Sequence, residues 1–178
     1  MSLTLMTPPI AEPITLNDIK SHLRVTHNDE DALLTGIIIA AVRAIEARCA
    51  IAMSPQQWRL RLDTMPSLLT LPIGPVIGLD SVTVTNVSGT EQSIDEALYE
   101  TSSGRIRLTA PWPKAALGGI AITFTAGFTD DVPAPLLQAA KMLCGAFYEQ
   151  RESTSATRFF DVPQAIDALI APYREMRL

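Results

Sequence analysis

The feature that most constrains the fold is a stretch of helix-like sequence that is apolar on more than one side. Between residues 33 and 45 most side chains are aliphatic or alanine: Leu33, Leu34, Ile37, Ile38, Ile39, Ala40, Ala41, Val42, Ala44 and Ile45. A surface helix needs only one apolar stripe, so a helix that is apolar nearly all round is buried on several sides. The stretch therefore predicts a helix with more than one neighbour.

Three more helices are expected. Residues 136–148 again place apolar side chains on most faces, and prolines are tolerated in the first turn that precedes them. Thr15 and Asp18 resemble a capping box, which predicts a short helix ending near Arg24. A last helix begins at Pro163. We expect the two long helices, residues 29–49 and 135–151, to form the packing core and also part of the contacts between copies of the chain.

The middle of the chain changes to a period of two. Residues 58–62, 82–85, 105–108 and 120–125 alternate apolar and polar side chains, which is typical of half-buried strands. Residues 57–126 are therefore expected to form a small antiparallel β-sheet inserted between helices two and three. The predicted fold class is α+β and mainly helical, with a bundle formed by the N- and C-terminal helices.

We expect residues 1–178 to form a single domain. Residues 1–13 carry three prolines and little charge, and are predicted to be a flexible arm. This arm has no basic residue, and no apolar run in the chain reaches the length that crosses a bilayer, so we expect a soluble protein made in a cytoplasm. Cys49 and Cys144 lie in apolar stretches and are expected to be buried and reduced.

The charge argues against tight binding of nucleic acid. The chain has 14 Lys and Arg against 19 Asp and Glu, a net charge of −5, and contains no basic run. Neutralising phosphates requires clustered basic side chains, although a surface past which DNA slides remains compatible. The mean hydropathy of +0.20 indicates a large core or an apolar surface that partner subunits cover.

No catalytic, cofactor or metal site is predicted. The acidic trio of Asp29, Glu30 and Asp31 could be read as a metal site, but capping of the helix that Asn28 opens explains it better, because consecutive helical residues point in different directions. His22 and His27 are five residues apart rather than four. Glycine-rich phosphate loops and nucleophile elbows are absent from the sequence, but a site assembled only in three dimensions stays open.

Two aromatic features have alternative interpretations. Trp112 lies between two prolines and either covers the edge of the small sheet or anchors a docked partner. Phe159 and Phe160 either pack on the last helix or contact a neighbouring molecule.

The order of these pieces resembles the head–tail connector family of long-tailed bacteriophages, also described as head-completion or DNA-packaging adaptors. Residues 15–25 resemble the family's opening Leu-x-x-x-Lys-x-x-Leu-Arg-Val, and residues 28–31 its acidic start of the second helix. Further likeness is found at residues 54–58, 71–76, 124–133, 147–152 and 169–174. The likeness extends over residues 14–174, and it includes no catalytic motif.

The resemblance implies a structural, non-enzymatic virion protein. It implies a homo-oligomeric ring beneath the phage portal protein that extends the channel for double-stranded DNA, without sequence-specific binding and without a membrane. A downstream head-completion or tail protein would dock on the ring. Such a protein is made in the host bacterial cytoplasm and then resides in the virion, and its gene belongs to an active phage or a prophage.

Candidate interface residues are chosen among arginines and aromatic side chains. They are Arg43, Arg48, Trp112, Arg151, Arg158, Phe159, Phe160 and Arg174. Charge reversal at Arg43 or Arg48 is predicted to weaken assembly more than folding. The alternatives are a small soluble α+β binding domain that forms no ring, and an uncharacterised hydrolase.

Overall fold

The computed structural model describes residues 1–110, 114–149 and 164–174. The helices are α1 (Leu16–Leu23), α2 (Asp31–Cys49), α3 (Ala134–Glu149) and α4 (Gln164–Ile170), with 3₁₀ turns η1 (Glu96–Leu98) and η2 (Ala171–Tyr173). The strands are β1 (Ser2–Thr7), β2 (Gln56–Leu62), β3 (Leu68–Thr70), β4 (Val76–Thr85), β5 (Glu91–Ser93), β6 (Tyr99–Ser102), β7 (Arg105–Leu108) and β8 (Ile120–Ala126). The chain divides into a β unit, Met1–Ile10 with Ser54–Thr129, and a helical unit, Ala11–Met53 with Asp130–Leu178.

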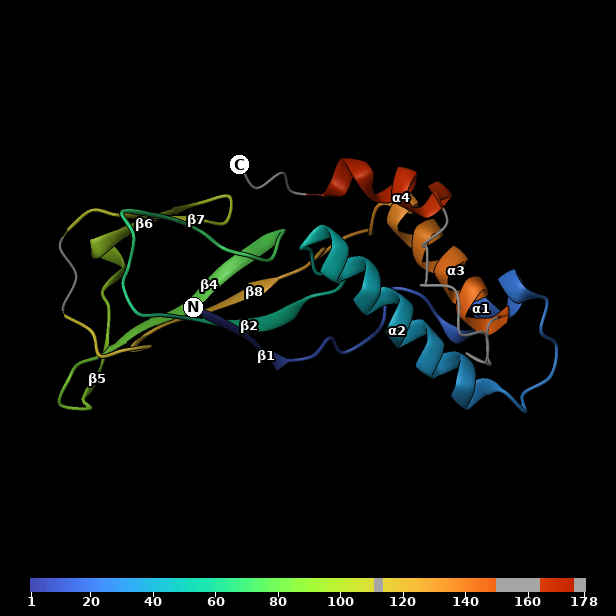
Figure 1. Ribbon diagram of the computed structural model, residues 1–178, viewed down its shortest axis with the longest axis horizontal. Helices are drawn as coiled ribbons and strands as arrows, with labels where there is room; N and C mark the ends of the chain where they lie inside the picture. The colour runs from blue at the N-terminus through green and yellow to red at the C-terminus, as the bar shows by residue number, and fades with distance from the viewer. Residues whose placement is uncertain (111–113, 150–163, 175–178) are drawn as a thin grey trace, which may run out of the picture. The chain divides into compact units, whose positions relative to one another are not determined.

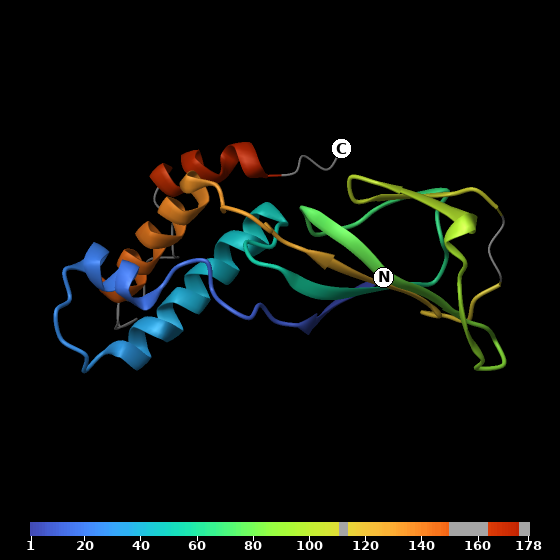
Figure 2. The same cartoon turned by 180° about the vertical axis from the view of Figure 1, so that it is seen from behind.

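The β unit contains two antiparallel sheets, which Figures 1 and 2 show from opposite sides. The larger sheet has the order β1-β2-β8-β4-β5, and the smaller has the order β3-β7-β6. Alternate side chains of the central strands are buried, including Leu60, Ile122 and Phe124, each 0% exposed. The period of two in the sequence thus predicted the buried faces of these strands correctly.

The predicted flexible arm over residues 1–13 is wrong for its first half. Ser2–Thr7 forms β1, which pairs antiparallel with β2 so that Leu3 lies opposite Leu60. Alternate residues of β1 are half-buried, so the strand completes the edge of the larger sheet. Its partner lies about sixty positions away in the sequence, and a pairing that distant leaves no local signal.

The description as mainly helical is not confirmed. The α+β class and the antiparallel pairing are as expected, but strands and helices contribute comparable lengths among the described residues. The sequence also indicated one small sheet, whereas the structure has two sheets. The strands that the sequence did not indicate are β1, whose partner is distant, and short strands such as β3 and β5, which have three residues each and are too brief to show a period.

In the helical unit, α1 is bounded as its sequence predicts. Thr15 is the N-cap, and its side chain and that of Asp18 form a reciprocal capping box. Hydrogen bonds from Thr15 hold the pKa of Asp18 below its ordinary value. Arg24 ends the helix in the left-handed conformation, with φ of 58°.

The second helix starts later than predicted. Glu30 is the N-cap and α2 begins at Asp31, so Asn28 and Asp29 precede the helix rather than open it. The reason is that Asn28 accepts a hydrogen bond from Lys20 of α1 instead of capping α2. The core of the unit is formed by fully buried aliphatic side chains of all four helices: Ile19, Leu34, Ile45, Leu136, Leu143, Ile166 and Ile170.

A glycine closes β8. Gly127 has φ of +141°, and a Cβ atom built there would lie 2.3 Å from the backbone oxygen of Ser54, so a larger residue does not fit.

In the described ranges, no helix has both the length and the apolar character needed to cross a bilayer.

Candidate assembly surface

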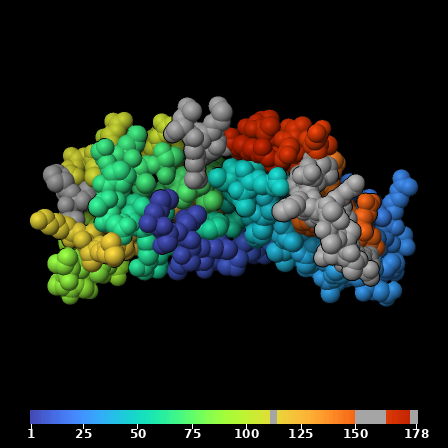
Figure 3. Space-filling model, viewed as in Figure 1, coloured from blue at the N-terminus to red at the C-terminus, as the bar shows by residue number. Residues whose placement is uncertain are grey.

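An apolar hollow lies between α2 and α3 of the helical unit. Its lining residues are Ala32, Leu33, Gly36, Ile37 and Ala40 of α2, and Phe147 of α3. The hollow measures about 530 Å³, and its lining includes no charged side chain. The two helices lie side by side in both ribbon views, and Figure 3 shows atoms of α2 at the surface of this unit. An apolar concavity in the surface of a helix pair is a site for another apolar group.

Neighbouring positions of α2 have opposite environments. Leu33 and Ile39 are each 43% exposed, whereas Leu34 is 0% and Ile38 is 3% exposed. The second pair packs in the unit's own core, so the predicted apolar excess of this helix has two parts. One part is buried within the chain, and the other remains at the surface.

Gly36 is one of the residues that line the hollow. It lies in the interior of α2, is exposed, and a Cβ atom added there would have no neighbouring atom within 4 Å. A glycine in a helix interior destabilises the chain by roughly 0.5–1 kcal/mol relative to alanine. The described part of the chain gives no packing reason for a glycine here, whereas close approach of another molecule supplies one.

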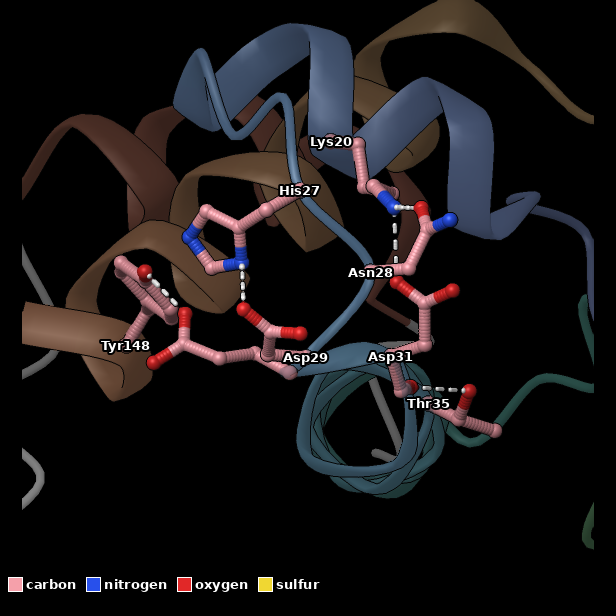
Figure 4. Close-up of polar contacts among 8 residues, drawn as sticks. Lys20, His27, Asn28, Asp29, Asp31, Thr35 and Tyr148 are labelled. Atoms are coloured by element: carbon pink, nitrogen blue, oxygen red, sulfur yellow. Dashed lines mark hydrogen bonds and ion pairs between the residues drawn. The ribbon is translucent and has the colours of Figure 1, made fainter.

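A polar cluster lies at the N-terminal end of α2, beside the hollow (Figure 4). Lys20 Nζ donates to Asn28 Oδ1 at 2.6 Å and to Asp31 Oδ1 at 2.7 Å. Tyr148 of α3 donates its hydroxyl proton to Glu30 Oε2 at 2.6 Å. These bonds join α1, α2 and α3 at one end, so the cluster fixes the geometry of the helix pair that forms the hollow.

The acidic trio does not converge on one point. Asp29 faces His27 at 3.6 Å and Asp31 faces Lys20, as Figure 4 shows. Glu30 instead accepts the hydrogen bond from Tyr148. A hard cation requires several oxygens directed at one position. Within the described ranges, no group of three or more His, Cys, Asp or Glu side chains is arranged to hold a metal ion.

Arg43 is part of the chain's own network. Its guanidinium contacts Glu12 Oε1 at 2.7 Å and Glu46 Oε2 at 2.5 Å. Glu46 is 6% exposed, and its other oxygen accepts a hydrogen bond from the backbone of Met53 at 2.7 Å. Burial raises the pKa of Glu12, an effect that Arg43 opposes and Glu46 reinforces. A role for Arg43 at an interface stays a prediction, but its reversal would also perturb folding.

Arg48 and Arg174 share one carboxylate. Both contact Asp167 Oδ1, at 3.4 Å and 2.5 Å respectively, and all three side chains are partly exposed. The contact joins α2 and α4 to Arg174, the residue that directly follows η2. Their predicted interface role also remains untested. Trp112, Arg151, Arg158, Phe159 and Phe160 lie outside the described residues.

Both cysteines are free and buried, as expected. Burial raises the pKa of the Cys144 thiol to about 11 and also raises that of Cys49. A thiol with a raised pKa forms little thiolate near neutral pH and is a poor nucleophile. Cys144 lies against the carbonyl oxygen of Ile37 at 4.0 Å, so it packs α3 on α2.

Neither the glycine nor the hollow was predicted from the sequence. Residues 33–45 read as one apolar block, and the individual residues predicted at the interface were arginines and aromatics. A usable signal was present, because Ala32, Gly36 and Ala40 recur at a spacing of four and therefore share one helix face.

Comparison with protein families identifies the chain. Residues 13–101 match the model of the phage gp6-like head-tail connector protein. The chain belongs to this family. The connector match begins just before α1, leaves out β1, and extends through β2–β5 into β6. No curated protein matches the chain.

Solved structures include similar chains that match over the full length. One belongs to the neck of an empty gene transfer agent (GTA) particle, computed with C6 symmetry, with 29% sequence identity and a TM-score of 0.82. Another belongs to the virion of the native particle, with the same identity and TM-score. A third belongs to the neck of the native particle, computed with C12 symmetry, with a TM-score of 0.81. Each match covers 100% of this chain and 97% of the other.

These matches assign a structural role to the connector chain rather than an enzymatic one. They also agree with its α+β architecture, since the likeness covers both units.

Proposed function

We propose that copies of this chain form a ring that joins the head of a tailed phage or phage-like particle to its tail. The ring lies beneath the portal protein and extends the channel through which double-stranded DNA passes. A head-completion or tail protein docks on its other side. The chain is made in the bacterial cytoplasm, where DNA packaging and assembly take place, and then becomes part of the virion, encoded by an active phage or a prophage.

The single observation that carries the proposal is the full-length likeness to chains of a particle neck. At 29% identity and a TM-score of 0.82 the likeness covers every part of the chain. Those necks were computed with C6 and C12 symmetry, which supports a cyclic arrangement of copies here as well.

The hollow on α2 supports contact between copies. A large apolar surface that is absent from the chain's own core gains stability when a partner covers it. Leu33, at 43% exposure, is the clearest member of this surface. The net charge of −5 supports a conduit that does not hold DNA tightly.

The alternative is a small soluble binding domain that acts without a ring, or a hydrolase. No described feature favours the hydrolase, and the buried thiols with raised pKa values make poor nucleophiles.

The decisive experiment is deletion of the gene, followed by electron microscopy of the particles. DNA-filled heads and separate tails are expected, and an intact copy of the gene supplied in trans should restore joined particles. Fully joined, infectious particles produced without the chain would overturn the proposal.

A matched pair of variants separates assembly from folding. Leu33→Lys places a charge in the hollow and should leave the thermal unfolding of the chain nearly unchanged while reducing ring formation. Leu34→Lys buries an unpaired charge and should unfold the helical unit, because Leu34 is 0% exposed. Circular dichroism and native mass spectrometry measure the two properties. Normal rings from Leu33→Lys would exclude this face from the contact.

A further inference from the structure

The hollow on α2 needs an apolar group from another copy, and the chain carries an exposed candidate. Ile10 is 104% exposed, the largest exposed fraction among the large hydrophobic side chains described. It follows β1 and precedes Glu12, which is bound by Arg43. Pro8, Pro9 and Pro13 surround it, and each proline fixes its own φ angle.

Ile10 is therefore an exposed side chain on a segment of restricted conformation. The strand before it is paired with β2, and the glutamate after it forms an ion pair of 2.7 Å. A segment stiffened by prolines loses little conformational freedom when it docks. Val87 and Leu117 are also exposed, at 85% and 91%, but both belong to loops of the β unit with a glycine one or two residues after them.

The segment and the hollow match in chemistry. From Met1 to Ala11 no side chain is charged, and the hollow likewise has no charged lining residue. Gly36, which lines the hollow of about 530 Å³, has open space where a Cβ atom would lie. Two different surfaces that complement each other make a head-to-tail contact, which is the kind that closes a ring.

We propose that Ile10 of one copy inserts into the α2–α3 hollow of the next copy. This inference rests on the proposed ring, and it names the surfaces that meet in it. The segment around residues 8–13 then acts as an arm between copies, and Gly36 leaves open the space that Ile10 fills, which a side chain there would occupy.

Disulfide trapping tests the contact directly. Ile10→Cys is combined in one chain with Ala32→Cys or, separately, with Ala40→Cys, at two positions of the hollow. Disulfide formation by each variant is followed over time in a glutathione redox buffer. The native thiols are buried and do not compete. A ladder of covalent multimers should form at least tenfold faster than in control variants that carry Val87→Cys or Leu117→Cys in place of Ile10→Cys.

The ratio of the trapping rates of Ile10→Cys and the control variants tests the contact both in stable rings and in transient encounters between copies. Equal trapping rates for Ile10 and the two control positions would overturn the insertion. Ile10→Ser, compared with Val87→Ser, gives an independent measure, since it should weaken self-association without changing the melting temperature. Trapped multimers that never close into rings under the electron microscope would contradict the proposed ring but not this contact.

Discussion

Replacement of Gly36 tests the central argument about α2, because two substitutions should have opposite consequences for folding and for assembly. Gly36→Ala adds a Cβ atom that has no neighbour within 4 Å, in a helix where the backbone is already helical. Alanine should therefore stabilise the isolated chain by about 0.5–1 kcal/mol. For a chain of this size, that free energy corresponds to a rise in the melting temperature of roughly 1–4 °C.

Gly36→Leu has nearly the same helix propensity benefit, so it should also raise the melting temperature. Its side chain occupies the hollow of about 530 Å³, and a partner group that enters there is displaced. We expect the concentration at which copies associate to rise by at least about tenfold, which is about 1.4 kcal/mol. Most substitutions that impair assembly also weaken folding, so a more stable chain that assembles poorly is a distinctive result.

Thermal unfolding of dilute monomer and native mass spectrometry over a concentration series measure the two effects. Gly36→Gln, a long polar side chain with good helix propensity, serves as a second blocking variant. Unchanged assembly by Gly36→Leu would refute the argument that the hollow is a contact. A lower melting temperature of Gly36→Ala would show that the glycine has a role inside the chain.

Three other substitutions test the fold. Thr15→Ala removes the capping box of α1 and should lower the free energy of unfolding by about 1 kcal/mol, whereas replacement of the exposed Asn17 of the same helix by alanine should change it little. Phe124→Ala empties a fully buried position of β8 and should lower it by about 3–5 kcal/mol, measured by urea unfolding of the β unit's near-ultraviolet signal. Burial raises the folded pKa of Glu12 above its ordinary value of 4.5, so its favourable contribution is complete below pH 4.5 and is lost as the pH rises through the folded pKa. The stability of the wild type relative to Glu12→Gln should therefore decline from pH 4.5 to 7, and a rising difference would contradict the assigned burial effect.

The sequence allowed good prediction of elements whose signals are local. The capping box at Thr15 placed the start of α1, and the alternation around Leu60 and Phe124 identified the buried faces of β2 and β8. Elements that depend on distant partners were less predictable. β1 pairs with residues 57–61, and its alternation was masked by the prolines that follow it.

The acidic start of α2 illustrates a different limit. Asn28 has the right chemistry for an N-cap, and a sequence offers no means to know that Lys20 binds it instead. The same limit applies to Arg43, which looked like a surface cation until Glu12 and Glu46 were found beside it. Charged side chains are difficult to assign because their partners come from any part of the chain.

The candidate assembly surface shows why an apolar count does not locate an interface. In the sequence, Leu33 and Leu34 are equivalent, yet one is 43% exposed and the other is buried completely. The helix turn decides this difference, since adjacent residues face about 100° apart on a helix of 3.6 residues per turn. The glycine locates the interface better than the leucines do, because a glycine in a helix interior lowers the stability of the helix and has no side chain that could interact with solvent. Gly36 at an open position of α2 therefore argues for a neighbour beyond the residues that the structure describes.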